Sequence, residues 1–566
     1  MRFARTSKFV GALAVSALAL TACGGGNNTG SGDNNNAEGD PTAIITAYGG
    51  EPQRPLIPAD TGEVFGGRIV DQLFQGLFSY DLEGKPVNEV AESIESDDQQ
   101  TYTIKIKGDK KFTNGEPITA KTFVDTWNFA ANSKNALNNA YFFESIEGYA
   151  DVSATKVDGK TAEGEDNVVP APKAETMSGL KVVDDTTFTV KLSQPEADFP
   201  LRLGYSAFYP MPSAALADPK AYGENPVGNG PYKLATETGA WQHDKQIDLV
   251  KNDEYSGPRE AKNGGITFKF YTDPAPAYAD IQSDNLDVLD VIPPTNLRTY
   301  TQDLPDRNLN KPYAGNATLN IPSYVEGFAF DEEGKLRREA LSYAINRQEV
   351  TDVVYQGTRF PAKDFTAPTL NGYKEDIPGS EKLNFDADKA KELWDQANQI
   401  KPWDDSRKLT LAYNSDGGNK EWIDAVANQL RTNLGINAEG KAYPQFASML
   451  DDRMNKKLDG LVRAGWQGDY PSLYNFLGPL LATGASSNYE EYSNPEFDKL
   501  LKEGLGAPSV DEANAKFNQA QEILFEDLPN LPLWSNAVQV GWSSKVQNVD
   551  TDWRGVVLYN QITKTQ

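Results

Sequence analysis

The stretch from Arg463 to Leu477 gathers charged side chains, glycines and aromatic rings within one short segment. Arg463 and Asp469 carry opposite charges six positions apart, and such a pair can bind the two ends of a zwitterionic ligand, because buried charges need partners. Gly465 and Gly468 would let that ligand approach the backbone closely. The structural alternative is that Asp469 caps a loop and Arg463 forms a surface ion pair.

The pattern of the N-terminal segment indicates a targeting signal. Arg2, Arg5 and Lys8 precede an apolar run over 9–20, which is short for a membrane-spanning helix. The run ends in Leu-Thr-Ala-Cys23, which looks like a bacterial lipobox, so we predict a signal peptide over 1–22 and lipidation of Cys23. The alternative is an ordinary secretory signal with a chance cysteine. Cys23 is the only cysteine, so the sequence excludes an intramolecular disulfide.

Residues 23–40 are rich in glycine and asparagine and nearly lack apolar side chains, so we expect a flexible tether after the lipidated cysteine. Removal of the signal takes away three basic residues and no acidic one, which moves the net charge from −27 to about −30. Such an acidic chain is a poor nucleic-acid binder. We therefore expect a lipid-anchored protein on the extracytoplasmic face of the cell membrane, monomeric and without nucleic acid as a partner.

Regular elements are expected to carry the charged stretch. Tyr102, Ile104 and Ile106 alternate with polar residues, which predicts a half-buried strand, and Thr119 is the expected N-cap of the following helix. A strand over 409–413, an amphipathic helix over 421–434 closed by Gly435 and a further extended run predict an α/β lobe with parallel pairing.

The clearest helical pattern covers 336–357. Its apolar stripe predicts solvated positions for Arg337, Arg338 and Glu339 beside it. The stretch from Arg463 to Leu477 itself has the composition of a loop.

Four segments of the sequence share a recognisable pattern. They are Val-Ala-Glu-Ser with its strand and helix (90–123), Val-Gly-Asn-Gly-Pro-Tyr-Lys-Leu (227–234), Leu-Arg-Arg-Glu-Ala-Leu-Ser-Tyr-Ala-Ile-Asn-Arg (336–347) with Pro361-Ala362, and Trp-Gln-Gly-Asp-Tyr-Pro (466–471). Together they resemble one family, the large extracytoplasmic solute-binding proteins of ABC importers, of the oligopeptide and dipeptide class (solute-binding family 5). The segments keep the family's order, between about residue 42 and the C-terminus. Where the family often continues Asp-Pro, this chain has Ser472-Leu473.

The resemblance implies a periplasmic-binding-protein-like type II α/β fold. Two α/β lobes would surround a ligand cleft, which closes by hinge motion, and a third lobe would be inserted. The implied boundaries are 41–80 with 219–319 and 538–566 for lobe I, 81–218 for lobe II and 320–537 for lobe III.

The resemblance also implies a site and a function. Asp469 would pair with the α-ammonium of a peptide, Arg463 with its carboxylate, and Gly465, Trp466 and Gln467 would bond its main chain. Tyr470 is a further expected contact, although it can also pack. The protein would be no enzyme and would need no cofactor. It would deliver short peptides to the permease and ATPase subunits of an ABC transporter.

The sequence leaves three alternatives to a peptide ligand. An oligosaccharide ligand would favour stacking on tryptophans over Asp469, and the available rings are Trp241, Trp394, Trp422, Trp466 and Trp534. A nickel or other metal site is disfavoured, because His243 is the only histidine. A secreted hydrolase would rest on Ser153-x-x-Lys156 and Ser283-Asp-Asn285, but the third motif of such enzymes, Lys-Thr-Gly, is absent.

Overall fold

A computed structural model describes residues 39–153, 171–236, 238–415, 418–444, 446–485 and 487–565. The predicted signal peptide, Cys23, nearly all of the predicted tether and Lys156 lie outside these residues.

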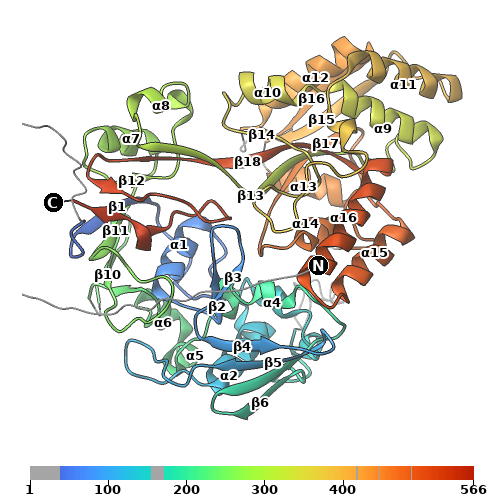
Figure 1. The fold of residues 1–566 in the computed structure, drawn as a ribbon. Coiled ribbons are helices and arrows are strands. Elements are labelled where there is room, and N and C mark those ends of the chain that lie inside the picture. Colours follow the sequence, from blue (N-terminus) through green and yellow to red (C-terminus); the bar gives the residue numbers. More distant parts are fainter. Residues whose placement is uncertain are drawn as a thin grey trace, which may run out of the picture. The chain divides into compact units, whose positions relative to one another are not determined.

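One large mixed sheet organises the described chain. Its strands are β1 (Ile44–Gly49), β8 (Tyr232–Leu234), β9 (Trp241–Gln242), β10 (Gln246–Lys251), β11 (Gly265–Phe270), β12 (Val288–Leu289), β13 (Asn308–Asn320), β14 (Phe360–Pro361), β15 (Lys408–Asn414), β16 (Asn437–Tyr443), β17 (Leu461–Gln467) and β18 (Asn530–Trp542). Their order is β16-β15-β17-β13-β18-β12-β1-β11-β10-β8, with β14 on β18 and β9 on β10 (Figure 1). β1 pairs in parallel with β11, and β15 with β16, which confirms the parallel pairing predicted for the second pair.

Two long strands join the two halves of this sheet. The first residues of β13 pair with the last residues of β18, next to β12 and β1. The last residues of β13 pair with β17 and with the beginning of β18. The pairing of β13 with β18 shifts register between Pro312 and Asn316, so the regular ladder is interrupted where the strands pass from one half to the other (Figure 1).

A separate four-stranded antiparallel sheet, in the order β4-β5-β7-β6, consists of β4 (Ala91–Glu95), β5 (Thr101–Ile106), β6 (Leu180–Asp184) and β7 (Thr187–Lys191). Tyr102, Ile104 and Ile106 are buried along β5 while the residues between them are exposed, as the alternation predicted. Helix α2 (Ala120–Ala131) contacts this sheet, and Thr119 caps it through a capping box, so the predicted N-cap is confirmed. Two small pairs are β2 (Phe78–Tyr80) with β3 (Pro86–Asn88), and β19 (Val546–Gln547) with β20 (Thr563–Lys564).

The helices complete the layers around the sheets. The longer ones are α1 (Val64–Leu73), α7 (Pro274–Gln282), α9 (Glu332–Ala344), α10 (Arg347–Val353), α11 (Ala387–Ile400), α12 (Lys420–Leu434), α13 (Phe446–Met454), α14 (Tyr474–Leu481), α15 (Pro495–Leu505) and α16 (Val510–Asp527). The short ones are α3 (Tyr149–Val152), α4 (Phe199–Arg202), α5 (Ser213–Ala217), α6 (Pro219–Glu224) and α8 (Tyr300–Asp303). Gly435 ends α12 at a φ of 73°, which confirms the predicted C-terminal glycine.

The prediction for 336–357 was wrong in two respects. The segment forms two helices, because Ile345 leaves the helical conformation and Asn346 caps α10. Arg337 and Arg338 are fully buried instead of solvated. Arg338 donates to the carbonyl oxygens of Phe328, Ile321 and Leu528, and Arg337 stacks against the rings of Trp394 and Trp403. In the folded protein, carbonyl oxygens and aromatic rings thus take the place of the water that would otherwise solvate the two guanidinium groups.

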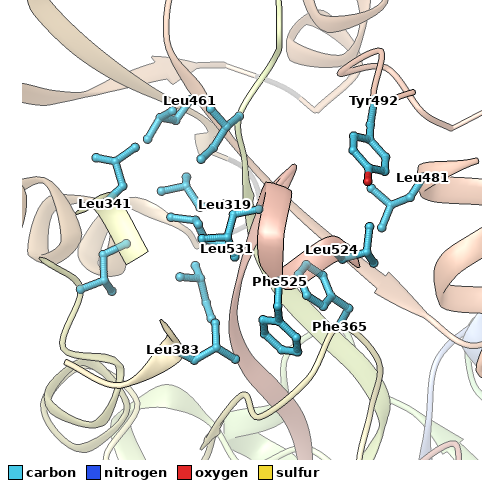
Figure 2. Packing of buried hydrophobic residues seen from close by; sticks show 14 of the residues in the cluster. Leu319, Leu341, Phe365, Leu383, Leu461, Leu481, Tyr492, Leu524, Phe525 and Leu531 are labelled. Atoms are coloured by element: carbon cyan, nitrogen blue, oxygen red, sulfur yellow. The ribbon is translucent and has the colours of Figure 1, made fainter. Parts of the chain in front are cut away.

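Buried side chains form several clusters instead of one continuous core. The largest cluster packs helices α9 to α12 and α14 to α16 against β13, β15, β17 and β18, and Figure 2 shows part of it around Leu319, Leu461 and Leu531. A second cluster lies between the four-stranded sheet and α2. Two further clusters line the part of the large sheet that contains β1, β10 and β11, and α7 beside it. The division into three lobes at the stated boundaries stays a prediction.

Candidate functional site

The stretch around Arg463 is a strand edge, not the loop that its composition indicated. β17 pairs with β13 from Val462 to Gln467, but it pairs with β15 only at Leu461 and Val462. Along Ala464 to Gln467, the second edge of β17 has no strand partner within the described residues. Gly465 and Gln467 are exposed there. A strand edge of this kind offers main-chain donors and acceptors to an extended ligand.

Asp469 follows this edge and faces a cavity of about 390 Å³. The cavity is also lined by Gln467 and Gly468 from the end of β17, by Arg68 and Asp71 of α1, and by Arg554. It therefore lies among segments that are hundreds of residues apart in the sequence.

Asp469 is the carboxylate of this cavity whose charge no neighbouring group balances. Asp71 pairs with Arg554 at 2.9 Å, and Arg68 pairs with Asp290. Glu63 accepts hydrogen bonds from the backbone N–H groups that begin α1, at 2.7 and 2.8 Å. Asp469 makes no ion pair with any residue in the described ranges. Burial raises its pKa to about 6, and a hydrogen bond from Asn475 opposes that rise only in part.

Asn475 was missed by the sequence analysis, although it holds the site together. Its side chain is 2% exposed at the beginning of α14. Oδ1 accepts from the backbone N–H of Asp469 at 3.0 Å and from the indole N–H of Trp466 at 2.9 Å. Nδ2 donates to Oδ2 of Asp469 at 3.4 Å. One buried amide thus orients both the carboxylate and the tryptophan ring, and no sequence signal separates it from an ordinary helical asparagine.

The other predicted site residues fall into different surroundings. Trp466 and Gly465 line a second cavity, on the side of α13 and α14. Arg463 lies in β17 with its guanidinium carbon 5.5 Å from the centre of the Phe446 ring. Tyr470 is only 5% exposed and packs under the guanidinium of Arg202, at 5.0 Å. The structure brings Gln467 and Asp469 to one cavity, and it places Tyr470 in packing contact.

The residues on which the sugar-binding and hydrolase alternatives depend do not line the cavity at Asp469. Four tryptophans considered for sugar stacking are buried in the hydrophobic clusters, namely Trp241, Trp394, Trp422 and Trp534. Ser283 and Asn285 sit at the exposed end of α7, where Asn285 donates to the Ser283 hydroxyl at 3.1 Å. The described residues contain no group of histidine, cysteine and acidic side chains arranged to hold a metal ion. None of the described helices combines the length and apolar character needed to cross a bilayer.

The raised pKa of Asp469 predicts a pH-dependent stability difference. Because the folded protein binds this proton more tightly than the unfolded chain does, the contribution of Asp469 to wild-type stability falls as pH rises from about 4 to about 6. Asp469→Asn removes that loss. In the absence of ligand, the variant should be more stable by about 1 to 3 kcal/mol at pH 7.5, and equally stable at pH 4.

Urea unfolding of both proteins at the two pH values measures this difference directly, because all other titrating groups are shared. A variant that is less stable than the wild type at pH 7.5, or that gains equally at both pH values, would contradict the assigned burial of the Asp469 charge.

The sequence and the fold of this chain are similar to those of known proteins. Residues 85–488 match the family model described as bacterial extracellular solute-binding proteins, family 5 Middle. The oligopeptide-binding protein OppA of Bacillus subtilis (strain 168) is 27% identical over 539 residues, which cover 91% of this chain and 92% of the relative.

Two solved structures share the fold. The murein tripeptide binding protein MppA of Escherichia coli has a TM-score of 0.68 at 23% identity, covering 94% of this chain and 100% of that one. OppA of Haemophilus influenzae in complex with RPPGFSPFR also has a TM-score of 0.68 at 23% identity, covering 93% and 100%. The predicted type II periplasmic-binding-protein-like α/β fold is thereby confirmed. Because the family model spans well over half of the sequence, the chain belongs to the bacterial extracellular solute-binding proteins of family 5.

Proposed function

We propose that this protein captures short peptides outside the cytoplasmic membrane and delivers them to an ABC importer. The observation that carries the proposal is Asp469, a desolvated carboxylate that forms no ion pair with any of the described residues and lies beside the open edge of β17. A cationic group on the ligand would supply the missing charge, and an extended main chain would supply the missing strand.

A peptide meets both requirements at once. Its α-ammonium would bind Asp469, and its backbone would run antiparallel to β17, along Gly465 and Gln467, toward Arg463. Six residues of an extended strand span at most about 20 Å, so a ligand that reaches both charges is a peptide of about two to five residues. A neutral sugar would leave the charge of Asp469 unbalanced and the strand edge unpaired, which favours a peptide over an oligosaccharide.

The comparisons support the same ligand class. The relative from B. subtilis is named an oligopeptide-binding protein, and the relative from H. influenzae was solved in complex with RPPGFSPFR. Such binding involves no bond breakage, so we propose a carrier and no enzyme.

The anchoring part of the proposal rests on the sequence alone. The lipobox-like end of the signal peptide would make Cys23 the lipidated N-terminus, and the glycine- and asparagine-rich segment after it would tether the protein to the membrane. The intact mass of protein extracted from membranes tests this: a chain that retains residues 1–22, or that begins at an unmodified residue, would refute it.

Two measurements test peptide capture. Mass spectrometry of ligands released from denatured, freshly purified protein should detect a mixture of short peptides. Calorimetric titration should show that trialanine binds, while N-acetyl-trialanine binds at least about thirtyfold more weakly, because acetylation removes the charge that pairs with Asp469.

Trialanine amide keeps the ammonium and lacks only the terminal carboxylate, so it separates loss of the Asp469 contact from loss of the contact with Arg463. Release of sugars alone, or equal affinities for trialanine and its N-acetyl form, would refute peptide capture by this carboxylate.

A further inference from the structure

The loop that carries Asp469 is contacted by two segments that lie hundreds of residues earlier in the sequence. One is the turn between β2 and β3, where Gly84 has a φ of 76° and a Cβ atom added to it would lie 2.8 Å from Cβ of Pro471. The other is α4 with the residues before it, which contacts Tyr470 and Ser472. The position of the loop thus depends on groups outside β17 and α14.

Three charged side chains, here named the buried charge cluster, lie at the second of these contacts. They are Glu196, Asp198 and Arg202, and all three are buried. Nη2 of Arg202 lies 2.8 Å from Oε2 of Glu196 and 3.7 Å from Oδ1 of Asp198. Nη1 of Arg202 donates to the Ser145 hydroxyl at 2.7 Å, and the guanidinium carbon lies 5.0 Å from the centre of the Tyr470 ring.

Asp198 is bonded to the loop through Ser472. The Ser472 hydroxyl donates to Oδ2 of Asp198 at 2.9 Å and accepts from the backbone N–H of Tyr474 at 3.1 Å. Tyr474 begins α14, and Leu473 at the cap position provides no side-chain hydrogen bond. Ser472 therefore satisfies one of the N–H groups that the start of this helix leaves without an intrahelical partner.

Asn475 is the next residue of α14. Its amide accepts from the backbone N–H of Asp469 and from the indole N–H of Trp466. A continuous series of hydrogen bonds and one peptide unit thus connects Asp198, through Ser472, to the carboxylate that would bind the ligand.

A contribution to stability does not account for the buried charge cluster. Oδ1 of Asp198 and Nε of Arg202 are buried without a hydrogen-bond partner in the described part of the chain. Glu196 and Asp198 share one guanidinium, and burial raises the pKa of both carboxyls. Desolvation of such charges offsets most of their mutual attraction. The cluster instead fixes geometry, because the Ser472 hydroxyl keeps its bond to Asp198 only while the loop stays in place.

We infer that Asp198 and Arg202 are positioning residues for peptide capture. They act through Ser472 and Tyr470, which follow Asp469 in the same loop, and they hold Asp469 where it can pair with an α-ammonium. A binding group is effective only when the groups around it lock its position. The inference rests on the proposed function, since it needs a ligand cation at Asp469.

The affinities of Ser472→Ala for trialanine and N-acetyl-trialanine at pH 7.5 test the inference. The two peptides differ in the charged ammonium, so the ratio of their dissociation constants reports the pairing with Asp469. This ratio should be at least about thirtyfold in the wild type. It should fall about tenfold in Ser472→Ala, as binding does when metal sites lose outer hydrogen-bond partners. Trialanine binding should account for the fall, and affinity for N-acetyl-trialanine should stay within about threefold of the wild type.

Ser342→Ala is the matched control. Ser342 is also buried, and its hydroxyl donates to the Lys382 carbonyl at 2.7 Å and accepts from Arg347 at 3.0 Å. The variant loses the same kinds of hydrogen bond in α9, outside the lining of the Asp469 cavity. It should therefore lose stability to a similar extent, measured by urea unfolding, and keep the wild-type ratio.

Two substitutions of Asp198 provide a second test, which decides the inference if Ser472→Ala does not fold. Asp198→Ala removes the acceptor of the Ser472 hydroxyl and should lower the ratio as Ser472→Ala does. Asp198→Asn keeps an acceptor oxygen, and Glu196 still pairs with Arg202, so this variant should keep most of the wild-type ratio.

The outcomes separate the inference from the proposed function. If Ser472→Ala and Asp198→Ala keep the wild-type ratio, or if Ser342→Ala lowers it equally, the inference is overturned and peptide capture stands. Equal losses in Asp198→Asn and Asp198→Ala overturn positioning through the Ser472 hydrogen bond. If the wild type binds neither peptide, or binds both equally, the proposed function falls together with the inference.

Discussion

Asp469→Asn is expected to weaken trialanine binding by about a hundredfold or more at pH 7.5. The substitution keeps the shape of the side chain and leaves an amide oxygen to accept the hydrogen bond from Asn475, so the loss reports charge. Removal of one partner from a buried, hydrogen-bonded charge pair costs about 2 to 5 kcal/mol, because the other charge is then desolvated without compensation. Isothermal titration calorimetry measures the loss directly.

A matched variant and a second readout make this test specific. Asp511→Asn, at an exposed position of α16, should bind trialanine with wild-type affinity. Peptide at about a hundred times its dissociation constant should stabilise the wild type by about 2.7 kcal/mol, and should barely stabilise Asp469→Asn at the same concentration. If Asp469→Asn binds trialanine as tightly as the wild type, Asp469 does not contact the ammonium.

Glu490→Ala is expected to lower the free energy of unfolding by about 3 to 5 kcal/mol. The Glu490 side chain is 4% exposed and receives hydrogen bonds from Arg453 at 2.6 and 2.8 Å and from Asn320 at 3.0 Å. The substitution leaves the Arg453 guanidinium buried without its carboxylate, which is the costly way to break a buried ion pair. Urea unfolding of the ligand-free protein at pH 7.5 measures the effect.

The next residue in the sequence provides the control. Glu491 pairs with Lys456, but both side chains are about half exposed, so Glu491→Ala should cost at most about 1 kcal/mol. If the two variants are equally stable, the Arg453–Glu490 pair contributes no more than a surface pair.

Structural elements that depend on residues close together in the sequence could be predicted. The alternation at Tyr102, Ile104 and Ile106, the N-cap at Thr119 and the glycine after α12 depend on residues that are neighbours in sequence. The same holds for the parallel pairing of β15 and β16, which follows from a short strand–helix–strand unit. The motif around Trp466 and Asp469 also marked a candidate site, because its residue types, once matched to the family, predict ligand contacts.

The burial of Arg337 and Arg338 could not be predicted from their neighbours in the sequence. Charged residues beside an apolar stripe are usually solvated, but these two are enclosed by carbonyl oxygens and rings from segments far along the chain. Arg463 to Gln467 show the converse: a loop-like composition that includes Gly465 concealed a strand whose pairing partner is the distant β13.

Family and fold type were thus available from the residues alone, through the resemblance of four ordered motifs, and the same resemblance singled out Asp469 as the candidate carboxylate. The charge environment of Asp469 was not available, because it depends on which cations lie near it after folding: Arg68 and Arg554 lie in the same cavity, but each is already bound to another carboxylate. The open edge of β17, the role of Asn475 and the second cavity, beside α13 and α14, arise in the same way. Each is made by groups that come together only when β13, β17, α13 and α14 pack, and that packing is a property of the whole chain.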